Sequence, residues 1–357
     1  MTKKMKTRAA VLEKIGEPLC IQELEIPELQ SGQVLVKILY SGICHSQINE
    51  IEGRKGEDKY LPHLLGHEGS GIVEKIGQKV NKVKPGDYVV LSWIKGVGED
   101  VFGCVYDNGR VNAGAITTFN TYAVISENRV FKIPTSVPPD VAALLGCAVP
   151  TGAGIIKNEL HMKKEHSLAI FGIGGIGVSA LIYACSIGAE KIFAVDINEY
   201  KLTFARTIGA THIINCLEED AIKKIKECTN GIGVDFALEC SGAKIAMEAA
   251  IASVKNTGTA IIAGNLKQGE KIAIDPFELI KGKNIRGTWG GATNPDEDIL
   301  FYANKYLEDV FPIHRLVTQV YSLEKINDAL QALKQGRVIR TLIKMETEEK
   351  ILPFMNK

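Results

Sequence analysis

The sequence predicts an α/β protein of two domains, one built on a doubly wound parallel sheet and the other rich in β-strands. Its 357 residues are too many for one ordinary hydrophobic core. Between about residues 152 and 290, apolar strands alternate with helical periods, which is the pattern of a parallel sheet covered by helices. Between about residues 7 and 150, short alternating strands are separated by Gly, Pro and Asn, which indicates antiparallel β-structure.

The strands expected in the first region carry apolar side chains at alternate positions. They are VLVKIL (34–39), GSGIVEKIG (69–77), GDYVVLSW (86–93) and TYAVISENRVFKIP (121–134). The second region is expected to contain strands at LAIFG (168–172), KIFAVD (191–196), THIIN (211–215), VDFALECSG (234–242) and TAIIAGN (259–265), and a helix that ends near IGA (208–210). After residue 290 we expect a helix at EKINDALQALKQG (324–336) and a strand at RTLIKM (340–345).

Composition argues against several classes of protein. Lys plus Arg and Asp plus Glu are equal at 42 each, so no basic surface for nucleic acid or an anionic membrane is expected. The eight cysteines form no C-x-x-C pair, and the charged N-terminus has no signal-peptide core, which favours the cytoplasm. Residues 167–189 are uncharged and long enough to span a membrane. Their glycines and the strand that follows favour a buried strand, turn and helix instead.

A G-x-G-x-x-G motif lies directly after the expected strand 168–172 and opens a helix. Its glycines are Gly172, Gly174 and Gly177, with Gly175 and Ile176 in the same turn. Such a turn places a pyrophosphate at a helix N-terminus. Asp196 lies nineteen residues past Gly177 and ends the next strand. Its carboxylate can accept hydrogen bonds from both ribose hydroxyls there. A carboxylate there repels a 2′-phosphate, so NAD is favoured over NADP. Lys201 is a candidate for a second ribose contact. The alternatives are a structural glycine turn and a solvated lysine.

Three residues of the types that zinc prefers are spread along the first region: Cys44, His67 and Cys147. Glu68 adjoins the histidine. Singly, a buried cysteine or a hydrogen-bonded histidine is an ordinary core residue. Together, two thiolates and one imidazole would make a three-ligand site with an open fourth position, which is the catalytic form of zinc site.

Several motifs spread along the chain point to one known family. They are GICHSQ, GHEGSGIVEKIG, VKPGDYVV, LLGCAVPTGAG, FGIGGIG, AVDIN, GATHIIN, GVDFALECSG and VIRTLI. Together they resemble the zinc-dependent medium-chain alcohol dehydrogenases over nearly the whole chain. The resemblance implies a GroES-like catalytic domain formed by residues 1–151 and 291–357 around a Rossmann domain formed by residues 152–290. It implies that Cys44, His67 and Cys147 bind a catalytic zinc ion, with Glu68 as an occasional or outer ligand. Other implied roles are a pyrophosphate contact for His45, a nicotinamide contact for Thr151, a phosphate contact for Arg340 and proton transfer for Ser46.

The sequence departs from many members of that family at three places. Gln47 stands where they have an Asp that orients the zinc-bound histidine, and Asn49 stands where some have a relay histidine that ionises. Their four-cysteine structural zinc site is reduced to Cys104, so we expect one zinc ion per subunit.

The resulting expectation is reversible, NAD-dependent and zinc-dependent oxidation of a small-molecule alcohol to an aldehyde or ketone. The alternatives are a polyol, sugar or cyclitol dehydrogenase of the same family, a zinc-free quinone or enone reductase, and a non-catalytic NAD(H)-binding protein. Trp93 is a candidate for the substrate cleft or for ordinary core. Relatives pair their cofactor domains into homodimers or homotetramers, and KIAIDP (271–276) is a candidate for the pairing edge strand.

Overall fold

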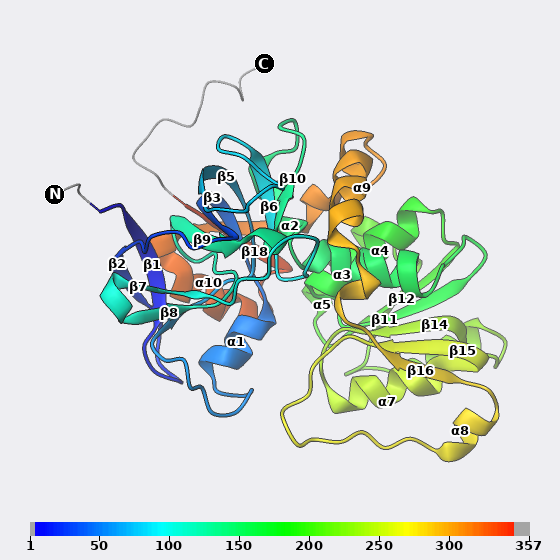
Figure 1. Cartoon of the computed structure of the whole chain (residues 1–357). Coiled ribbons are helices and arrows are strands. Elements are labelled where there is room, and N and C mark those ends of the chain that lie inside the picture. The colour runs from blue at the N-terminus through cyan, green and yellow to red at the C-terminus, as the bar shows by residue number, and fades with distance from the viewer. Residues whose placement is uncertain (1–3, 346–357) are drawn as a thin grey trace. The chain divides into compact units, whose positions relative to one another are not determined.

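The computed structural model describes residues 4–345, which divide into two compact units (Figure 1). One unit runs up to Cys147 and resumes at Asn294, and the other is Ala148–Thr293. The expected limits of the α/β domain, 152 and 290, lie four and three residues inside the second unit (152 against 148, and 290 against 293). The first unit is therefore assembled from both ends of the described chain.

The second unit has a six-stranded, fully parallel sheet in the order β13-β12-β11-β14-β15-β16, with helices on both faces (Figure 1). Its strands are β11 (Ser167–Phe171), β12 (Lys191–Asp196), β13 (His212–Asn215), β14 (Val234–Glu239), β15 (Val254–Ile262) and β16 (Asn284–Gly287). Its helices are α3 (Ala148–Gly154), α4 (Gly175–Ser186), α5 (Glu199–Ile208), α6 (Ala221–Cys228), α7 (Lys244–Ser253) and α8 (Pro276–Ile280). The strand order reverses between β11 and β14, and ligands bind outside the carboxyl ends of the strands at such a point.

The expected edge strand at residues 271–276 is absent, and the outer strands of this sheet are β13 and β16. Asp275 instead caps α8, because its side chain accepts a hydrogen bond from the backbone N–H of Phe277 at 2.9 Å. Pro276 then occupies the first helical position, where its missing N–H costs nothing. The Asp-Pro pair therefore begins a helix where a strand was expected.

The first unit contains two sheets, mostly antiparallel, whose orders are β2-β1-β4-β8-β7 and β10-β6-β5-β3-β18-β17, with β9 also paired to β3. The strands of the first sheet are β1 (Lys6–Leu12), β2 (Cys20–Glu25), β4 (His63–Leu64), β7 (Cys104–Tyr106) and β8 (Val111–Ala113). Those of the second are β3 (Gln33–Ile43), β5 (Glu68–Ile76), β6 (Tyr88–Ser92), β9 (Tyr122–Ser126), β10 (Val130–Lys132), β17 (Val317–Ser322) and β18 (Arg340–Lys344). Its α-helices are α1 (His45–Ile51), α2 (Pro139–Leu144), α9 (Pro295–Leu307) and α10 (Ile326–Lys334).

Short helices fill several connections between these elements. They are η1 (Asp107–Gly109), η2 (Glu127–Arg129), η4 (Gly290–Ala292), η5 (Ile313–Leu316) and η6 (Leu323–Lys325), which are 3₁₀ helices, and the π-helix η3 (Ile155–Glu159). Every strand and helix named from the sequence pattern, apart from residues 271–276, corresponds to an element of the structure, and the predicted fold class is confirmed.

The strand β3 organises the first unit. It pairs with β5, β9 and β18, and the register of the last pair places Thr341 opposite Ile43. Apolar residues of this sheet such as Val36, Ile38 and Leu91 are buried against α10, which contributes Leu330 and Leu333. The end of β3, immediately before Cys44, is therefore fixed by neighbours on both sides and by a core beneath it.

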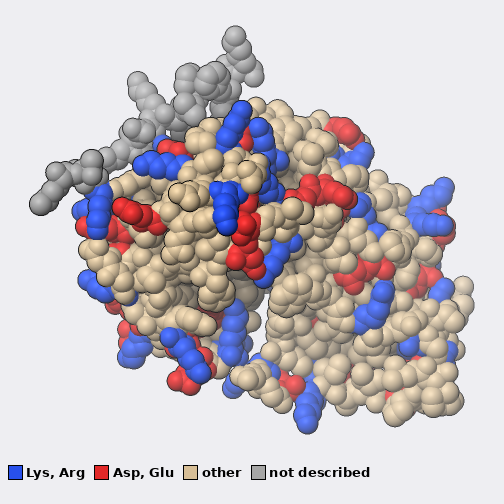
Figure 2. Space-filling view, viewed as in Figure 1, with Lys and Arg blue, Asp and Glu red and all other residues tan. Residues whose placement is uncertain are grey.

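Basic and acidic side chains are interspersed on the face shown in Figure 2. This distribution agrees with the equal numbers of basic and acidic residues in the sequence. Within residues 4–345, no helix has both the length and the apolar sequence needed to cross a bilayer. The apolar segment 167–189 is divided between β11, a glycine turn and the twelve-residue helix α4.

Candidate metal centre and dinucleotide site

Cys44, His67 and Cys147 come together in the first unit although 23 and 80 residues separate them along the chain. Cys44 follows β3, His67 directly precedes β5, and Cys147 follows α2. One potential ligand atom from each lies within 4.8 Å of the other two, and the His67 Nε2 atom is 3.3 Å from the Cys147 sulfur. Three side chains of this chemistry in this arrangement fit a zinc ion with one open position.

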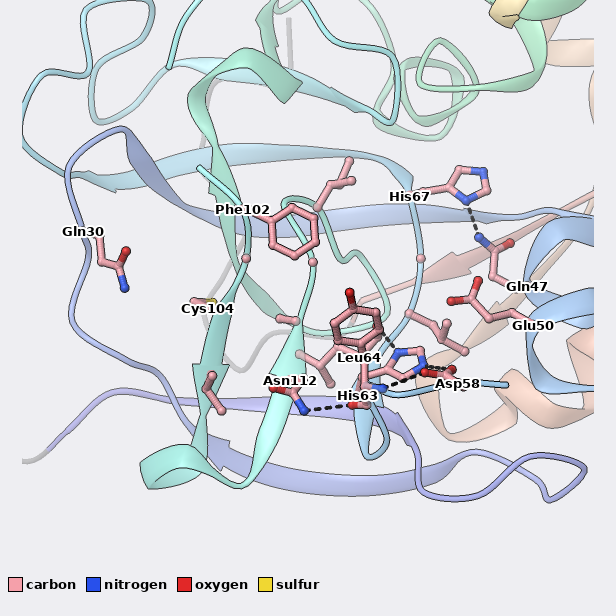
Figure 3. A pocket seen from close by; sticks show the side chains of 18 residues that line it. Gln30, Gln47, Glu50, Asp58, His63, Leu64, His67, Phe102, Cys104 and Asn112 are labelled. Atoms are coloured by element: carbon pink, nitrogen blue, oxygen red, sulfur yellow. Dashed lines mark hydrogen bonds and ion pairs between the residues drawn. The ribbon is translucent and has the colours of Figure 1, made fainter. Parts of the chain in front are cut away.

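The amide of Gln47 connects two of these residues. Its Oε1 atom accepts a hydrogen bond from the backbone N–H of Cys44 at 2.8 Å, and its Nε2 atom lies 2.5 Å from His67 Nδ1 (Figure 3). Gln47 is only 2% exposed, so the contact is shielded from water. In this arrangement the Gln47 NH₂ group donates to Nδ1. A metal ion on Nε2 of His67 would leave the ring proton on Nδ1, so the amide would have to turn its oxygen toward the ring and release the Cys44 N–H. Gln47 thus contacts the His67 nitrogen that would face away from a metal ion bound at Nε2.

The turn that carries Cys147 is held against the second sheet. The Ser92 hydroxyl at the end of β6 donates a hydrogen bond to the Gly146 carbonyl at 2.7 Å. A Cβ atom at position 146 would approach Glu68 Cβ to 2.7 Å, so only glycine allows this close contact. Gly66 has a φ of +90° and a Cβ there would lie 2.8 Å from the Phe119 nitrogen. Both turns beside the ligands therefore require glycine for steric reasons.

The two thiols differ in acidity because they contact each other. A hydrogen bond from Cys147 holds the pKa of Cys44 well below its usual value against the opposing effect of burial, with His67 and Arg340 lowering it further. The Cys44 thiolate and burial in turn raise the pKa of Cys147. The pair therefore readily gives up one proton. Binding zinc removes both, because zinc binds cysteine as the thiolate.

Glu68 and Arg340 form a buried ion pair beside the metal centre. Their side chains are 0% and 4% exposed, and the pair joins β5 to β18. Glu68 therefore lies beside the metal ligands, as predicted. Arg340 contacts Glu68 and lowers the pKa of Cys44, and these contacts are within the first unit. A phosphate contact for Arg340 and zinc ligation by Glu68 stay predictions.

The remaining residues predicted in the first unit surround the metal ligands. Ser46 and His45 lie in the first turn of α1; the Ser46 hydroxyl is 3.5 Å from His67 Nδ1, and His45 is exposed. Trp93, which follows β6, is close enough to Cys147 to oppose in part the effects of Cys44 and burial, which raise the pKa of that thiol. Trp93 therefore lies beside the predicted metal position, and its role in a substrate cleft stays a prediction.

Cys104 lies on β7, away from the metal centre. Burial raises the pKa of its thiol to about 12. In the described part of the chain, neither of the two groups of three or more possible metal ligands includes it. A metal site at Cys104 therefore has no support from its neighbours.

The predicted dinucleotide loop lies in the second unit between β11 and α4. Gly172 has a φ of +96°, and a Cβ there would come within 2.7 Å of the Ser241 nitrogen. A Cβ on Gly177 would lie 3.2 Å from the Ile170 side chain and collide with the Gly172 carbonyl, so this glycine allows the helix to pack on the strand. A Cβ on Gly174 would meet nothing within 4 Å. Gly174, which caps α4 before Gly175 and Ile176, therefore borders open space where a pyrophosphate fits.

Asp196 ends β12 and faces this loop. Its Oδ2 atom accepts from the backbone N–H of Ile173 at 2.7 Å, and Oδ1 accepts from Ile197 and Asn198 at 2.8 and 3.0 Å. A carboxylate has about four acceptor positions, so capacity for a ribose hydroxyl remains. Lys201 lies in the first turn of α5, beyond the Asn198 cap. The structure therefore brings Asp196 to the glycine loop.

Thr151, on α3, is 5% exposed, and within residues 4–345 its hydroxyl has no hydrogen-bond partner. A buried hydroxyl without a hydrogen-bond partner lowers the stability of the folded protein, and a ligand that forms a hydrogen bond with it removes this cost. This observation fits the predicted contact with a nicotinamide amide, which offers both a donor and an acceptor.

Sequence reasoning missed Glu239, the last residue of β14. Its side chain is fully buried and accepts hydrogen bonds from the Ser241 N–H at 2.7 Å and the Gly242 N–H at 2.8 Å. Burial raises the pKa of Glu239 despite these hydrogen bonds. Because Ser241 directly abuts Gly172, Glu239 positions the neighbour of the glycine loop. A polar residue at the carboxyl end of a parallel strand, in VDFALECSG, is the signal that could have identified it.

Two family models match separate parts of the chain. The alcohol dehydrogenase GroES-like domain matches residues 30–135, and the zinc-binding dehydrogenase model matches residues 175–301. The S-(hydroxymethyl)glutathione dehydrogenase of Escherichia coli (strain SMS-3-5 / SECEC) is 31% identical over 369 residues, which cover 95% of this chain and 100% of that protein. The alcohol dehydrogenase class-3 of Zea mays is 31% identical over 370 residues, which cover 95% and 97%.

Solved structures match over the same extent. The benzyl alcohol dehydrogenase of Acinetobacter calcoaceticus superimposes with a TM-score of 0.88 at 33% sequence identity, covering 96% of this chain and 100% of that chain. An alcohol dehydrogenase zinc-binding domain protein of Burkholderia ambifaria gives a TM-score of 0.89 at 31% identity, covering 97% and 100%. These likenesses extend over both units.

Proposed function

The chain belongs to the zinc-dependent medium-chain alcohol dehydrogenase family, and from that premise we propose that it oxidises an alcohol to an aldehyde or ketone with NAD. The observation that carries this proposal is the convergence of Cys44, His67 and Cys147, whose ligand atoms lie within 4.8 Å of one another. A zinc-free quinone or enone reductase has no chemical need for these three residues together. The same group therefore favours the alcohol dehydrogenase over that alternative.

Zinc bound by these residues would act as a Lewis acid that lowers the pKa of an alcohol hydroxyl. The chain's own residues then have separate tasks. The Ser46 hydroxyl, 3.5 Å from His67 Nδ1, is the group we assign to accept the alcohol proton. Gln47 fixes the orientation of the His67 ring through its contact with Nδ1, and Trp93 lies beside Cys147.

NAD, when bound, supplies the hydride acceptor of the reaction. Gly174 borders space for its pyrophosphate, and the Asp196 carboxylate is placed at the end of β12 to accept ribose hydroxyls. A negative charge at that point repels the 2′-phosphate of NADP. These two features support a preference for NAD.

Three further properties belong to the proposal. We infer one zinc ion at the three-ligand centre, because Cys104 has no partner cysteines with which to form a second thiolate site. We infer a homodimer or homotetramer, supported by the outer position of β16 in its sheet, since an edge strand is a template for pairing. A cytoplasmic location is supported by the free thiols of all eight cysteines.

The proposal is tested by a panel of alcohols and aldehydes with NAD(H) on protein of known zinc content. The panel includes aliphatic, aromatic and polyol substrates and S-(hydroxymethyl)glutathione. We expect turnover in proportion to zinc, with about one ion per chain at full activity. NAD binding without turnover across the panel, or equal turnover after zinc removal, would contradict it.

The role of Ser46 is tested separately by Ser46→Ala. We expect the hydride-transfer rate to fall by about 10²-fold or more, because a positioned proton acceptor contributes about that much. The affinity for NAD, measured by fluorescence titration, should stay the same. Ser31→Ala, which removes an exposed hydroxyl of the same unit, is the matched control. Equal turnover in Ser46→Ala and the parent protein would remove Ser46 from the mechanism.

A further inference from the structure

A second group of possible metal ligands lies in the first unit, apart from the three-ligand centre. It consists of Glu50 on α1, Asp58 in the loop that follows α1, and His63 on β4, with one ligand atom of each within 4.8 Å of the others. Figure 3 shows the three side chains turned toward one another at the wall of a pocket. The proposed oxidation of alcohols assigns no task to these residues.

His63 is 6% exposed, and both of its ring nitrogens face oxygen acceptors. Nδ1 lies 3.0 Å from the Leu64 carbonyl, an acceptor to which it donates in the tautomer that leaves Nε2 without a proton. In the neutral ring the Nε2 lone pair then faces the Asp58 carboxylate oxygen Oδ2 at 2.8 Å. Two acceptors at this distance repel each other unless a positive charge completes the contact, and either a proton or a metal ion can supply it.

The separation of 2.8 Å fits a metal ion as well as it fits a hydrogen bond. Ligand atoms about 2.1 Å from a six-coordinate ion lie about 3 Å from their nearest neighbours in the coordination sphere. The Nδ1 contact to a backbone carbonyl is the usual arrangement of a metal-binding histidine, since it fixes the tautomer with Nε2 free to bind. His63 is therefore oriented as a ligand.

The two carboxylates are also prepared for a cation. Asp58 Oδ1 accepts from the Tyr60 N–H at 2.9 Å, which leaves Oδ2 directed at His63. Glu50 Oε2 forms an ion pair with Lys55 at 2.9 Å, which leaves the other oxygen of that carboxylate. With His63 neutral, the carboxylates of Glu50 and Asp58 and the ammonium group of Lys55 together carry a net charge of about −1. An added cation would reduce this imbalance.

The pocket beside this group has a volume of about 560 Å³ and is lined by Glu50, Asp58 and His63 as well as by Gln47 and His67 (Figure 3). It leaves room for the water molecules that complete the coordination of a divalent ion. All its lining residues belong to the first unit. A cation there would have access to solvent and could exchange.

We propose that Glu50, Asp58 and His63 bind an exchangeable divalent cation of the kind that accepts two carboxylates and one imidazole, such as Mn²⁺. Glu50 is six residues after Cys44 and His63 is four residues before His67. The ion fastens together the segments that supply two of the three catalytic ligands. Its function is to brace the metal centre, and it takes no part in the oxidation itself.

Mn²⁺ is suited to the test because it binds thiolate sites weakly, and zinc at Cys44, His67 and Cys147 stays in place. Zinc-loaded full-length protein is titrated with Mn²⁺, and the loss of the free-ion signal is followed by electron paramagnetic resonance. We expect one Mn²⁺ to bind per chain and the thermal unfolding midpoint to rise with its concentration. If the signal of free Mn²⁺ does not fall at millimolar concentrations of protein and ion, the proposal is overturned. The contact between His63 and Asp58 would then be an ion pair only.

Three variants separate this site from adventitious binding. We expect Asp58→Asn and Glu50→Gln to weaken Mn²⁺ binding about tenfold or more, because each removes one charged oxygen ligand. Glu57→Gln removes the same charge from an exposed neighbour in the same loop and should bind Mn²⁺ as the parent does. An unchanged zinc content in each variant shows that the unit is folded. Mn²⁺ binding that is equal in Asp58→Asn and the parent protein would place the ion elsewhere and overturn the proposal.

Discussion

The dinucleotide loop and the metal centre are constructed in opposite ways. The loop is one contiguous stretch, residues 172–177, and its shape depends on positions at which a Cβ would collide with the Ser241 backbone or the Gly172 carbonyl. The metal centre draws Cys44, His67 and Cys147 from three segments of the other unit and holds them with the side chains of Gln47 and Ser92. The dinucleotide loop therefore depends on positions that lack a side chain, whereas the metal centre depends on particular side chains.

This difference teaches which changes each site tolerates. A loop formed by backbone fails when Gly172 or Gly177 gains a side chain, whereas we expect its ligand preference to depend on the charge of Asp196. A centre formed by side chains fails ligand by ligand, and its supporting contacts tune how tightly the metal is held. Because the two sites lie in different units, damage to one should leave the other able to bind its own ligand.

The largest expected effect comes from Cys147→Ser. Loss of one thiolate leaves two ligands, and we expect zinc to be lost and turnover to fall by about 10³-fold or more. NAD binding, measured by fluorescence titration, should be unchanged because the dinucleotide loop lies in the other unit. Cys104→Ser, which removes a buried thiol outside the centre, is the control and should retain zinc and activity. Weakened NAD binding in Cys147→Ser would show that the sites depend on each other.

Asp196→Gly acts on the dinucleotide site alone. Removing the carboxylate removes its repulsion of a 2′-phosphate, and we expect the ratio of kcat/KM for NAD to that for NADP to fall by about 100-fold. The zinc content should not change. Glu199→Gln, which neutralises an exposed acid three residues away, should leave the ratio as it is. An unchanged cofactor ratio in Asp196→Gly would defeat the assignment of the ribose contact.

A pH effect on stability is expected in the second unit. The Asp235 carboxylate is largely buried on β14; its contacts with Lys255 and Ser167 outweigh the cost of burial and lower its pKa to about 2. The folded-state pKa is below the unfolded value of 3.8, so the stabilisation is complete above about pH 5 and is lost as the pH falls through 2. It amounts to about 2 kcal/mol.

Asp235→Asn should therefore remove the contribution of Asp235, about 2 kcal/mol, from the loss of stability of this unit between pH 5 and pH 2. Urea unfolding followed at several pH values measures it. Glu227→Gln, an exposed carboxylate on α6, should leave the pH dependence unchanged. Parallel pH dependences for Asp235→Asn and the parent protein would contradict the assignment.

The smallest effects are expected at Gln47. Gln47→Leu removes both of its contacts and should speed the loss of zinc to a chelator by about tenfold, the lower end of the range for partners of metal ligands. Gln47→Glu offers only acceptor oxygens to the Cys44 N–H and the His67 Nδ1–H, and it should slow the loss. Zinc release can be followed with a coloured chelator. Equal rates in both variants would show that Gln47 does not act through His67.

The sequence pattern predicted most elements because each depends on local periodicity. The strand at KIFAVD and the loop at FGIGGIG lie where the pattern placed them, as β12 and the turn before α4. Residues 271–276 were predicted wrongly, because their alternating apolar residues suggest a strand while the Asp275-Pro276 pair caps a helix. The alternating pattern and the capping pair predict different structures for this segment, and the capping pair determines the structure.

Long-range pairing could not be predicted in the same way. The resemblance to a family singled out Glu68 and Arg340, but nothing in their spacing shows that the two would bury their charges against each other. Glu50, Asp58 and His63 also lie too irregularly in the sequence for their meeting to be foreseen. Their contact depends on the loop between α1 and β4, which brings residues 58 and 63 back to the helix.

The pairing of β18 with β3 has a consequence for how the protein is made. The strand that ends at Ile43 acquires its partner Thr341 only after the intervening Ala148–Thr293 unit has been synthesised. At common ribosomal rates of about 5–20 residues per second, that delay is roughly 15–60 seconds. The contiguous unit can fold during translation, while residues 40–43 of β3 must wait for their β18 partners. The sheet beside Cys44 is therefore completed last, although Cys44, His67 and Cys147 are all synthesised before the second unit begins.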